Sequence, residues 1–205
     1  MIHSAKERSA AFELTWSLDR KDRVVEIQYA IEAFEELYVS DRLWDYDKAN
    51  RRVPDPFGVY RFVNEGSLRV VFAQAPWPPN VALAEVYAPL YSRIRAGETH
   101  GRTIPIALPV DEYSSLASDI DSPTVLEEVS RAYFVMGYRL RSSMDSDPEP
   151  PINETAEQAG YIVHDPELLI SSMQVEKLPA KRRTGYIARF ALPGEPEPEP
   201  APPLP

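Results

Sequence analysis

Proline sets the strictest limits on how this chain can fold, because it fixes φ and has no backbone N–H to donate. The chain has 21 prolines among 205 residues, and they gather in a few places. Neither a helix nor a central strand can continue through residues 50–56, 76–79, 142–153 or 193–205. We therefore expect these segments to separate or follow the folded elements.

The last thirteen residues, PGEPEPEPAPPLP, contain seven prolines and three glutamates. Too few apolar side chains are present to offset the entropy of ordering, so we predict a disordered, extended and acidic tail over 193–205. Its PxxP spacing and terminal PPLP suit an aromatic-lined polyproline groove on a partner. An inert, solubilising end is the alternative, since the tail lacks the basic residue that usually flanks such ligands.

Composition indicates a globular protein, with 43% hydrophobic and 10% aromatic residues. The absence of cysteine excludes disulfides, thiolate metal sites and a cysteine nucleophile. A formal net charge of −10 disfavours binding to nucleic acid or to anionic membranes. We see no secretory signal and no apolar run long enough to span a membrane, and we expect a cytoplasmic protein.

Two regions have the pattern of β-structure. Residues 11–18 alternate between apolar and polar side chains, as in a half-buried strand. Residues 59–73 contain two β-rich runs around Gly66, which predicts a hairpin with a left-handed turn residue. We expect these side chains of the hairpin to face the core together: Tyr60, Phe62, Leu68, Val70 and Phe72.

Three other regions have apolar residues at helical spacing, and we predict amphipathic helices over 22–44, 81–96 and 123–141. Ser122-Pro123 is a typical helix start, with an N-cap followed by proline at the first position. Gly137 weakens the third helix, and residues 133–141 can instead form a strand.

The C-terminal part, residues 154–192, follows the proline-rich linker 142–153. Residues 168–175 and 184–192 read as strands, which the basic segment EKLPAKRR would join into a hairpin over 168–192. The expected fold class is α+β, with residues 1–141 as the main domain. Its antiparallel sheet of hairpins would be covered on one face by the amphipathic helices.

The basic segment holds the densest positive cluster of an acidic chain: Lys177, Lys181, Arg182 and Arg183. It is a candidate for docking a carboxylate-rich or phosphate-bearing partner, or the chain's own acidic tail. A solvated loop whose charges protect a strand edge is the alternative, which we favour.

Two tryptophans are candidate partner anchors. Trp77 lies between prolines in the sequence APWPPN, and Trp44 lies in an acidic, aromatic stretch. For Trp77, burial of the ring as a lid over the core is the alternative. That same stretch contains Asp41, Asp45 and Asp47, which we interpret as a charged helix end facing water.

The three histidines, His3, His100 and His164, stand alone in sequence, and no pair has metal-ligand spacing. His100 is the one we consider for catalysis, acting with Asp45 or Asp47 in a loop. No glycine-rich phosphate loop or nucleophile elbow is present, so we predict no cofactor and no metal.

Together these features favour a protein-interaction or accessory protein over an enzyme. The partner would be another protein, bound through exposed aromatic surface at Trp77 or Trp44 and through the tail. A small-molecule hydrolase using His100 is the second hypothesis, and a polyanion binder using Lys181, Arg182 and Arg183 is the third. Partner identity and oligomeric state are left open.

Overall fold

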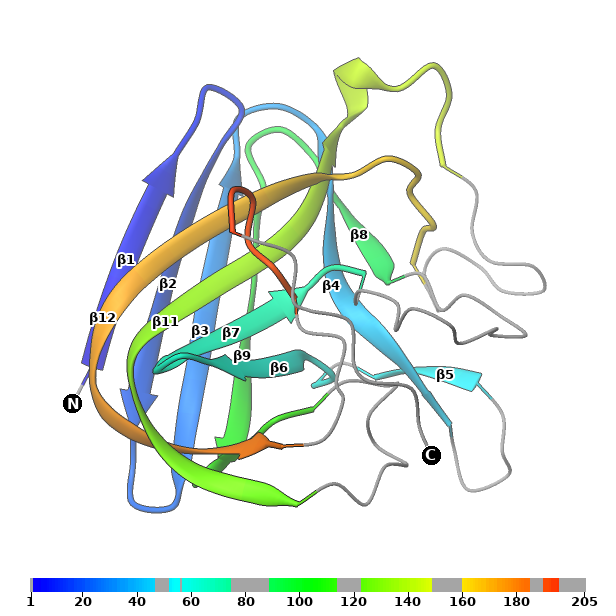
Figure 1. Ribbon diagram of the computed structural model, residues 1–205. Coiled ribbons are helices and arrows are strands. Elements are labelled where there is room, and N and C mark those ends of the chain that lie inside the picture. Colours follow the sequence, from blue (N-terminus) through cyan, green and yellow to red (C-terminus); the bar gives the residue numbers. More distant parts are fainter. Residues whose placement is uncertain are drawn as a thin grey trace.

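The computed structural model describes residues 2–46, 52–55, 57–74, 89–113, 123–148, 160–184 and 190–195. At positions 45, 46 and 52 it describes the backbone alone. Across these ranges the chain is built almost wholly from strands, and the one helical element is the 3-10 turn η1 (Arg141–Ser143). The strands form two sheets packed face to face (Figure 1).

The first sheet is antiparallel and, within the described part of the chain, has four strands in the order β1-β2-β3-β9. Their bounds are β1 (Ile2–Arg8), β2 (Phe12–Arg20), β3 (Val24–Ala33) and β9 (Thr99–Ala107). Alternate side chains of β2 and β3 are buried, so one face of this sheet lies on the core and the other faces solvent.

The second sheet has eight strands among the described residues, with the path β10-β12-β11-β4-β5. Off this path, β7 joins β6 to β11, and β8 pairs with β4. The bounds are β4 (Leu37–Tyr46), β5 (Arg52–Asp55), β6 (Tyr60–Asn64), β7 (Ser67–Phe72), β8 (Leu90–Ile94), β10 (Val110–Asp111), β11 (Thr124–Leu140) and β12 (Glu167–Arg183). The long, curved β11 and β12 run side by side across the molecule (Figure 1).

The main core lies between the two sheets, where aromatic rings from both meet. Trp16 of β2 packs on Phe134 of β11, with ring centroids 5.4 Å apart. Tyr29 of β3 contacts Phe72 and Phe134 at 5.5 and 5.4 Å. Each fully buried large side chain contributes about 1.5–3 kcal/mol through the hydrophobic effect, so this contact stabilises the sandwich strongly.

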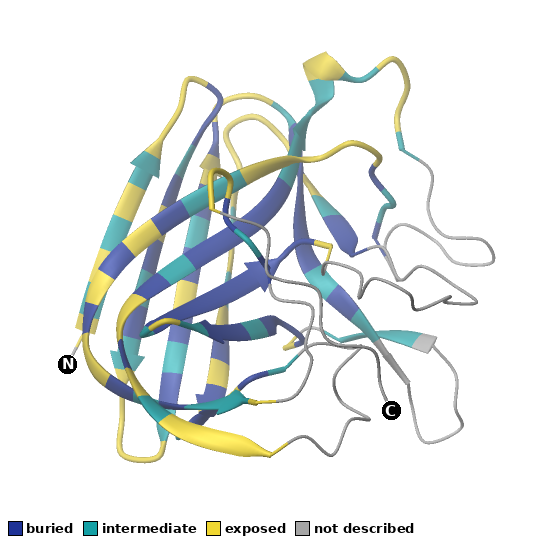
Figure 2. Ribbon diagram, viewed as in Figure 1, coloured by how far each residue is buried: buried dark blue, intermediate teal, exposed yellow. Residues whose placement is uncertain are grey.

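A second, smaller core covers the outer face of the eight-stranded sheet. Its members are Leu43, Tyr60, Phe62, Val71, Ala73, Val135, Phe190 and Leu192. β7 is therefore buried at every position, and Figure 2 shows it dark along its length.

The strand over 11–18 and the hairpin over 59–73 are confirmed as β2 and as β6 with β7. Gly66 occupies the turn with φ of +73°. Tyr60 and Phe62, however, do not share a face with Leu68, Val70 and Phe72. They belong to the second core, because both faces of this hairpin are covered.

The α+β prediction is wrong, and the first helix shows why. Residues 22–44 contain β3 and β4 in place of a helix. Val25, Ile27, Tyr29, Ile31 and Ala33 are all buried and recur at every second residue. The same segment thus satisfies the helical and the strand period at once, and pairing with β2 and β9 decides in favour of the strand.

The helix predicted over 123–141 is also wrong, because this segment is the strand β11. Ala132 and Phe134 point into the main core, while Tyr133 and Val135 point into the second. A strand that is buried on both faces loses its polar–apolar alternation, so its pattern resembles that of a helix. The alternative left open for 133–141, a strand, is correct.

Of the helix predicted over 81–96, residues 81–88 lie outside the described part. Residues 90–94 form the strand β8, so a helix there is wrong. With all three helices replaced by strands or undescribed, no helix covers a sheet face among the described residues.

The hairpin predicted over 168–192 is likewise not formed, because β12 runs unbroken through the basic segment EKLPAKRR. Pro179 is tolerated inside this strand, where β11 pairs along one side and only the two-residue β10 along the other. Beyond β12, residues 190–195 cross the outer face of the same sheet.

Candidate functional site

Within the described part of the chain, a dense set of polar side chains surrounds Asp41, where strands of the two sheets meet. Asp41 is fully buried, and its Oδ2 accepts hydrogen bonds from Ser92 Oγ at 2.9 Å and from Arg102 Nη2 at 2.9 Å. His100 Nε2 lies 2.7 Å from the same oxygen. Arg42 Nε lies 3.5 Å from Oδ1.

Local backbone geometry brings these groups together. Ser40 pairs with Tyr91 and Arg42 with Leu90, so Asp41 is the extra residue of a β-bulge in β4. Bulges re-aim side chains, and here the carboxylate turns inward. His100 and Arg102 alternate along β9 with outward-facing residues, so both reach Asp41 from the opposite sheet.

The Asp41 cluster joins the sheets and does not form a nucleophile with its base. Ser92 donates to Asp41, not to His100, so the relay that activates a serine in hydrolases is not in place. Tyr29 lies nearby on β3, and burial together with the charge of Asp41 raises the pKa of its hydroxyl. A carboxylate so enclosed by donors acts as an electrostatic link between β4, β8 and β9.

Of the candidate residues named from the sequence, His100 contacts the carboxylate of Asp41, and Asp45 and Asp47 were the partners expected for it. Asp47 and the side chain of Asp45 lie outside the described part, as does Trp77. Trp44 is half-buried in β4, opposite Pro54 of β5.

The cations of the basic cluster are matched by neighbouring carboxylates. Lys177 Nζ lies 2.8 Å from Glu128 Oε2, and Lys181 Nζ lies 3.5 Å from Asp111 Oδ1. Arg182 pairs with Glu127 across β11 and β12. The hydrogen bond to Glu128 raises the pKa of Lys177. Positive charge is thus balanced by acids within the sheet, and these residues lie in the strand β12 and not in the solvated loop of the alternative.

Arg183 is held by a different acid, Glu112, which is 1% exposed. The backbone N–H of Arg183 donates to Glu112 Oε2 at 2.7 Å, and the N–H of Val63 donates to Oε1 at 3.0 Å. This buried carboxylate fastens the end of β12 to β6.

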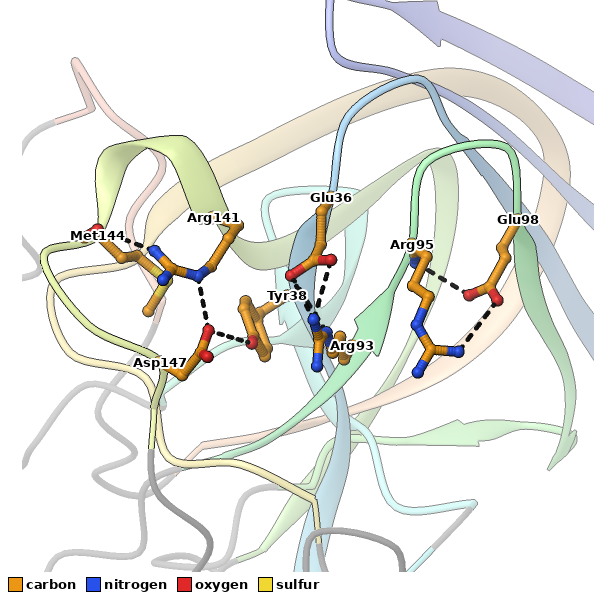
Figure 3. A network of polar contacts seen from close by, with 8 residues as sticks. All are labelled: Glu36, Tyr38, Arg93, Arg95, Glu98, Arg141, Met144 and Asp147. Atoms are coloured by element: carbon orange, nitrogen blue, oxygen red, sulfur yellow. Dashed lines mark hydrogen bonds and ion pairs between the residues drawn. The ribbon is translucent and has the colours of Figure 1, made fainter.

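A further polar network, drawn in Figure 3, joins β4 and β8 to the segment after β11. Arg93 donates from Nε and Nη2 to Glu36 at 3.1 and 3.0 Å. Arg141 Nε lies 2.6 Å from Asp147 Oδ1, to which the Tyr38 hydroxyl donates at 3.4 Å. Burial raises the pKa of Tyr38 to about 12. Glu36 and Asp147 are each paired with an arginine. The contacts of Asp147 with Arg141 and Tyr38 hold the segment after β11 against β4.

An open groove of about 690 Å³ lies on the solvent-facing side of the four-stranded sheet. Two cross-strand rows of outward side chains line it. One row is Ser4, Ser17, Gln28 and Thr103, and the other is Lys6, Thr15, Ala30 and Gly101.

Side-chain size explains the groove. The two middle rows carry small residues such as Ala30 and Gly101, while the flanking rows carry longer acids. Asp19 and Glu26 stand beyond one end, and Glu13 and Glu32 beyond the other. Part of this charge is matched, because Lys6 Nζ lies 2.6 Å from Glu13 and Lys21 Nζ lies 2.5 Å from Glu26.

Sequence reasoning missed Ser92, Arg102 and the groove. A usable signal was present for Arg102, because His100, Arg102, Ile104 and Ile106 alternate as the inward residues of one strand. Nothing comparable marked Ser92, whose role depends on the bulge in β4.

The chain matches no model of a known protein family, and neither a curated protein nor a solved structure matches it. Over the described ranges, no helix is long and apolar enough to cross a membrane. In the same ranges, no group of three or more histidine and acidic side chains is placed to hold a metal ion.

Proposed function

We propose that this chain is a non-catalytic binding module that recognises another protein through the solvent-facing side of its four-stranded sheet. The groove of about 690 Å³ on that face is the observation that carries the proposal. Its lining of hydroxyl and amide groups offers hydrogen bonds to a partner's backbone and side chains. A cytoplasmic location belongs to the same proposal, since the chain has no cysteine that an oxidising compartment would use.

The arrangement of the polar clusters supports binding over catalysis. Oδ2 of Asp41 is engaged in contacts between strands, and the basic residues of β12 are matched by acids. The groove differs, because its outward side chains are covered by no other element of the described chain.

The test uses the full chain with Thr15→Arg, which places a long cation in the middle of the groove. Thr124→Arg is the matched control, because Thr124 is exposed on β11 of the other sheet. Each protein is immobilised and incubated with cell extract, and retained proteins are quantified by mass spectrometry. We expect a partner retained by the parent chain and by Thr124→Arg to be lost with Thr15→Arg.

Retention of the same partners by all three proteins would contradict the proposal and move the binding surface elsewhere. Circular dichroism on each variant guards against loss through unfolding, and an outward-facing position such as Thr15 tolerates arginine structurally.

A neutral, hydroxyl-rich small ligand is a second candidate for the same groove. The observation in its favour is the lining by Ser4, Thr15, Ser17, Gln28 and Thr103, which suits sugar hydroxyls. Titration of the isotope-labelled chain with short oligosaccharides, followed by NMR, tests it. Shifts confined to β1, β2, β3 and β9 are expected for this ligand, and an unchanged spectrum rejects it.

A further inference from the structure

Residues 190–195, which we call the C-terminal strap, cross the outer face of the eight-stranded sheet, on the side opposite to the groove. Phe190 and Leu192 are 7% and 8% exposed and complete the second core. The ring of Phe190 lies 6.3 Å from that of Phe62. Figure 1 shows the strap in red, in front of the sheet near β7 and β11.

Beneath the strap lies Arg69 of β7, a charged residue that is only 3% exposed. Its Nη2 lies 2.8 Å from both carboxylate oxygens of Glu195, and its Nη1 donates to the carbonyl oxygen of Phe190. The guanidinium also lies 6.0 Å from the ring of Tyr133. The strap thus reaches Arg69 at both of its ends.

A tight turn at the end of the strap brings Glu195 back against Leu192. Its N–H donates to the Leu192 carbonyl at 3.0 Å, and its Oε2 accepts from the Leu192 N–H at 3.0 Å. Gly194 permits this turn with φ of +88°. Phe190, Leu192 and Glu195 therefore form one recognition unit of two apolar side chains and one carboxylate.

The chemistry of this site is set by the buried cation. Glu195 is the one carboxylate that contacts Arg69 in the described part of the chain, and a buried guanidinium that loses its carboxylate is destabilising. The site therefore requires an acidic occupant. Among the residues that the structure describes, the buried Arg69 Nε has no hydrogen-bond partner, so the strap leaves one donor of Arg69 unsatisfied. The strap itself contains no strand, so its side chains and its turn account for its placement.

We propose that the face around Arg69 is a peptide-binding site, and that the strap is its resident and exchangeable occupant. The ligand that it takes in trans is an extended segment of another protein with the same pattern. That pattern is two apolar residues two positions apart, followed by a glutamate three positions later. The site goes beyond the binding function proposed above, because it lies on the other sheet.

Competition determines when a trans ligand enters. A tethered strap has a high effective concentration, so a free peptide with the same contacts is at a disadvantage. Removing the carboxylate of Glu195 weakens the tethered strap as a competitor. A free peptide that retains its glutamate then provides the better partner for Arg69.

The test measures binding of a fluorescein-labelled peptide, IARFALPGEPE, to the full chain by fluorescence anisotropy. This peptide has the sequence of residues 187–197. We expect Glu195→Gln to bind it about tenfold or more tightly than the parent chain does. A matched peptide with glutamine at the position of Glu195 should bind the variant about tenfold or more weakly.

Arg69→Met provides a second variant, because a buried ion pair is often replaced by apolar side chains without loss of the fold. It should bind both peptides equally, since the cation that distinguishes them is gone. Thr15→Arg in the groove should leave peptide binding unchanged, which separates failure of this proposal from failure of the proposed function.

Equal affinity of Glu195→Gln for the two peptides would overturn the proposal, as would a preference for the acidic peptide that persists in Arg69→Met. A parent chain that dimerises in solution, and does so only when Arg69 is present, would assign the site to a second copy. That result, measured by light scattering, would overturn the proposal that the trans ligand comes from a different protein.

Discussion

At the scale of single residues, Asp41 links the two sheets through its buried carboxylate. Four donors or cations from three strands converge on its carboxylate: Arg42, Ser92, His100 and Arg102. Arg102 and His100 retain some contact with solvent, at 20% and 26% exposed, while Asp41 has none. If the negative charge of Asp41 is removed, His100 and Arg102 lose their anionic partner and are only partly hydrated in its place.

We predict that Asp41→Asn lowers the free energy of unfolding by about 2–3 kcal/mol. This lies somewhat below the full cost of breaking a buried ion pair, since the cations retain some water. Urea unfolding followed by tryptophan fluorescence measures it. Ser92→Ala is the control, with an expected loss of about 1–2 kcal/mol for the hydrogen bond that Ser92 donates to Asp41 and the one that it accepts from Arg42. Equal losses for the two variants would show that the charge of Asp41 is unimportant.

Gly101 allows a second prediction at this scale, because β9 approaches β3 closely there. A Cβ atom at Gly101 would collide with the backbone carbonyl of Tyr29, which cannot move aside without disturbing the strand. We expect Gly101→Ala to lower stability by about 2 kcal/mol through overpacking.

Gly66 provides the comparison for that measurement. A Cβ there meets nothing within 4 Å, so Gly66→Ala bears only the strain of its positive φ, about 1 kcal/mol. Thermal unfolding of both variants by circular dichroism tests the order. A more stable Gly101→Ala than Gly66→Ala would contradict it.

At the scale of elements, β11 and β12 define the second sheet. Both edges of β11 are used, by β12 on one side and by β7 and β4 on the other. Both of its faces are buried over Ala132 to Met136. The pairs Arg182–Glu127 and Lys177–Glu128 then connect the polar ends of the two strands.

We predict a modest coupling between Arg182 and Glu127, of about 0.5–1 kcal/mol, because both side chains are partly exposed. A double-mutant cycle with Arg182→Met and Glu127→Gln in urea unfolding measures it. The coupling should fall as salt is raised, since counter-ions screen such pairs. A cycle with no coupling at low salt would mean that Arg182 is available to a partner.

At the scale of the whole molecule, two cores share one central sheet. β7 and β11 contribute side chains to the main core on one face and to the second core on the other. The Trp16 indole N–H donates to Ser171 Oγ at 2.9 Å, which adds a polar link from the first sheet to β12. Neither sheet can lose its packing without exposing residues of the other.

Cooperative unfolding is the prediction that follows. Urea transitions monitored by tryptophan fluorescence and by far-ultraviolet circular dichroism should coincide, as for a two-state domain. Refolding should occur in milliseconds to seconds, because pairs such as Ile27 with Ile104 join distant parts of the chain. Separate transitions for the two probes would show that the sheets unfold independently.

The local sequence pattern was enough to predict elements that have one solvent-facing side or a turn marked by glycine. Apolar and polar residues alternate over 11–18 because β2 has a core side and a solvent side. Gly66 marks the turn between β6 and β7 because glycine readily adopts a positive φ. It was not enough for 123–141, where burial of both faces removed the alternation. In 22–44 it also failed, since this apolar-rich segment contains one set of residues at helical spacing and another at strand spacing, with Ile27 and Ile31 in both.

By itself, the sequence determined the turn at Gly66 and which side chains must avoid water, since both depend on the residue and its neighbours. Tertiary structure alone decided that these segments are strands, because a strand is stabilised by partners distant in sequence. It also decided that Asp41 meets His100 and Arg102, and that Glu195 meets Arg69. Such meetings depend on the bulge in β4 and on the path of the strap over the sheet, which no local spacing encodes.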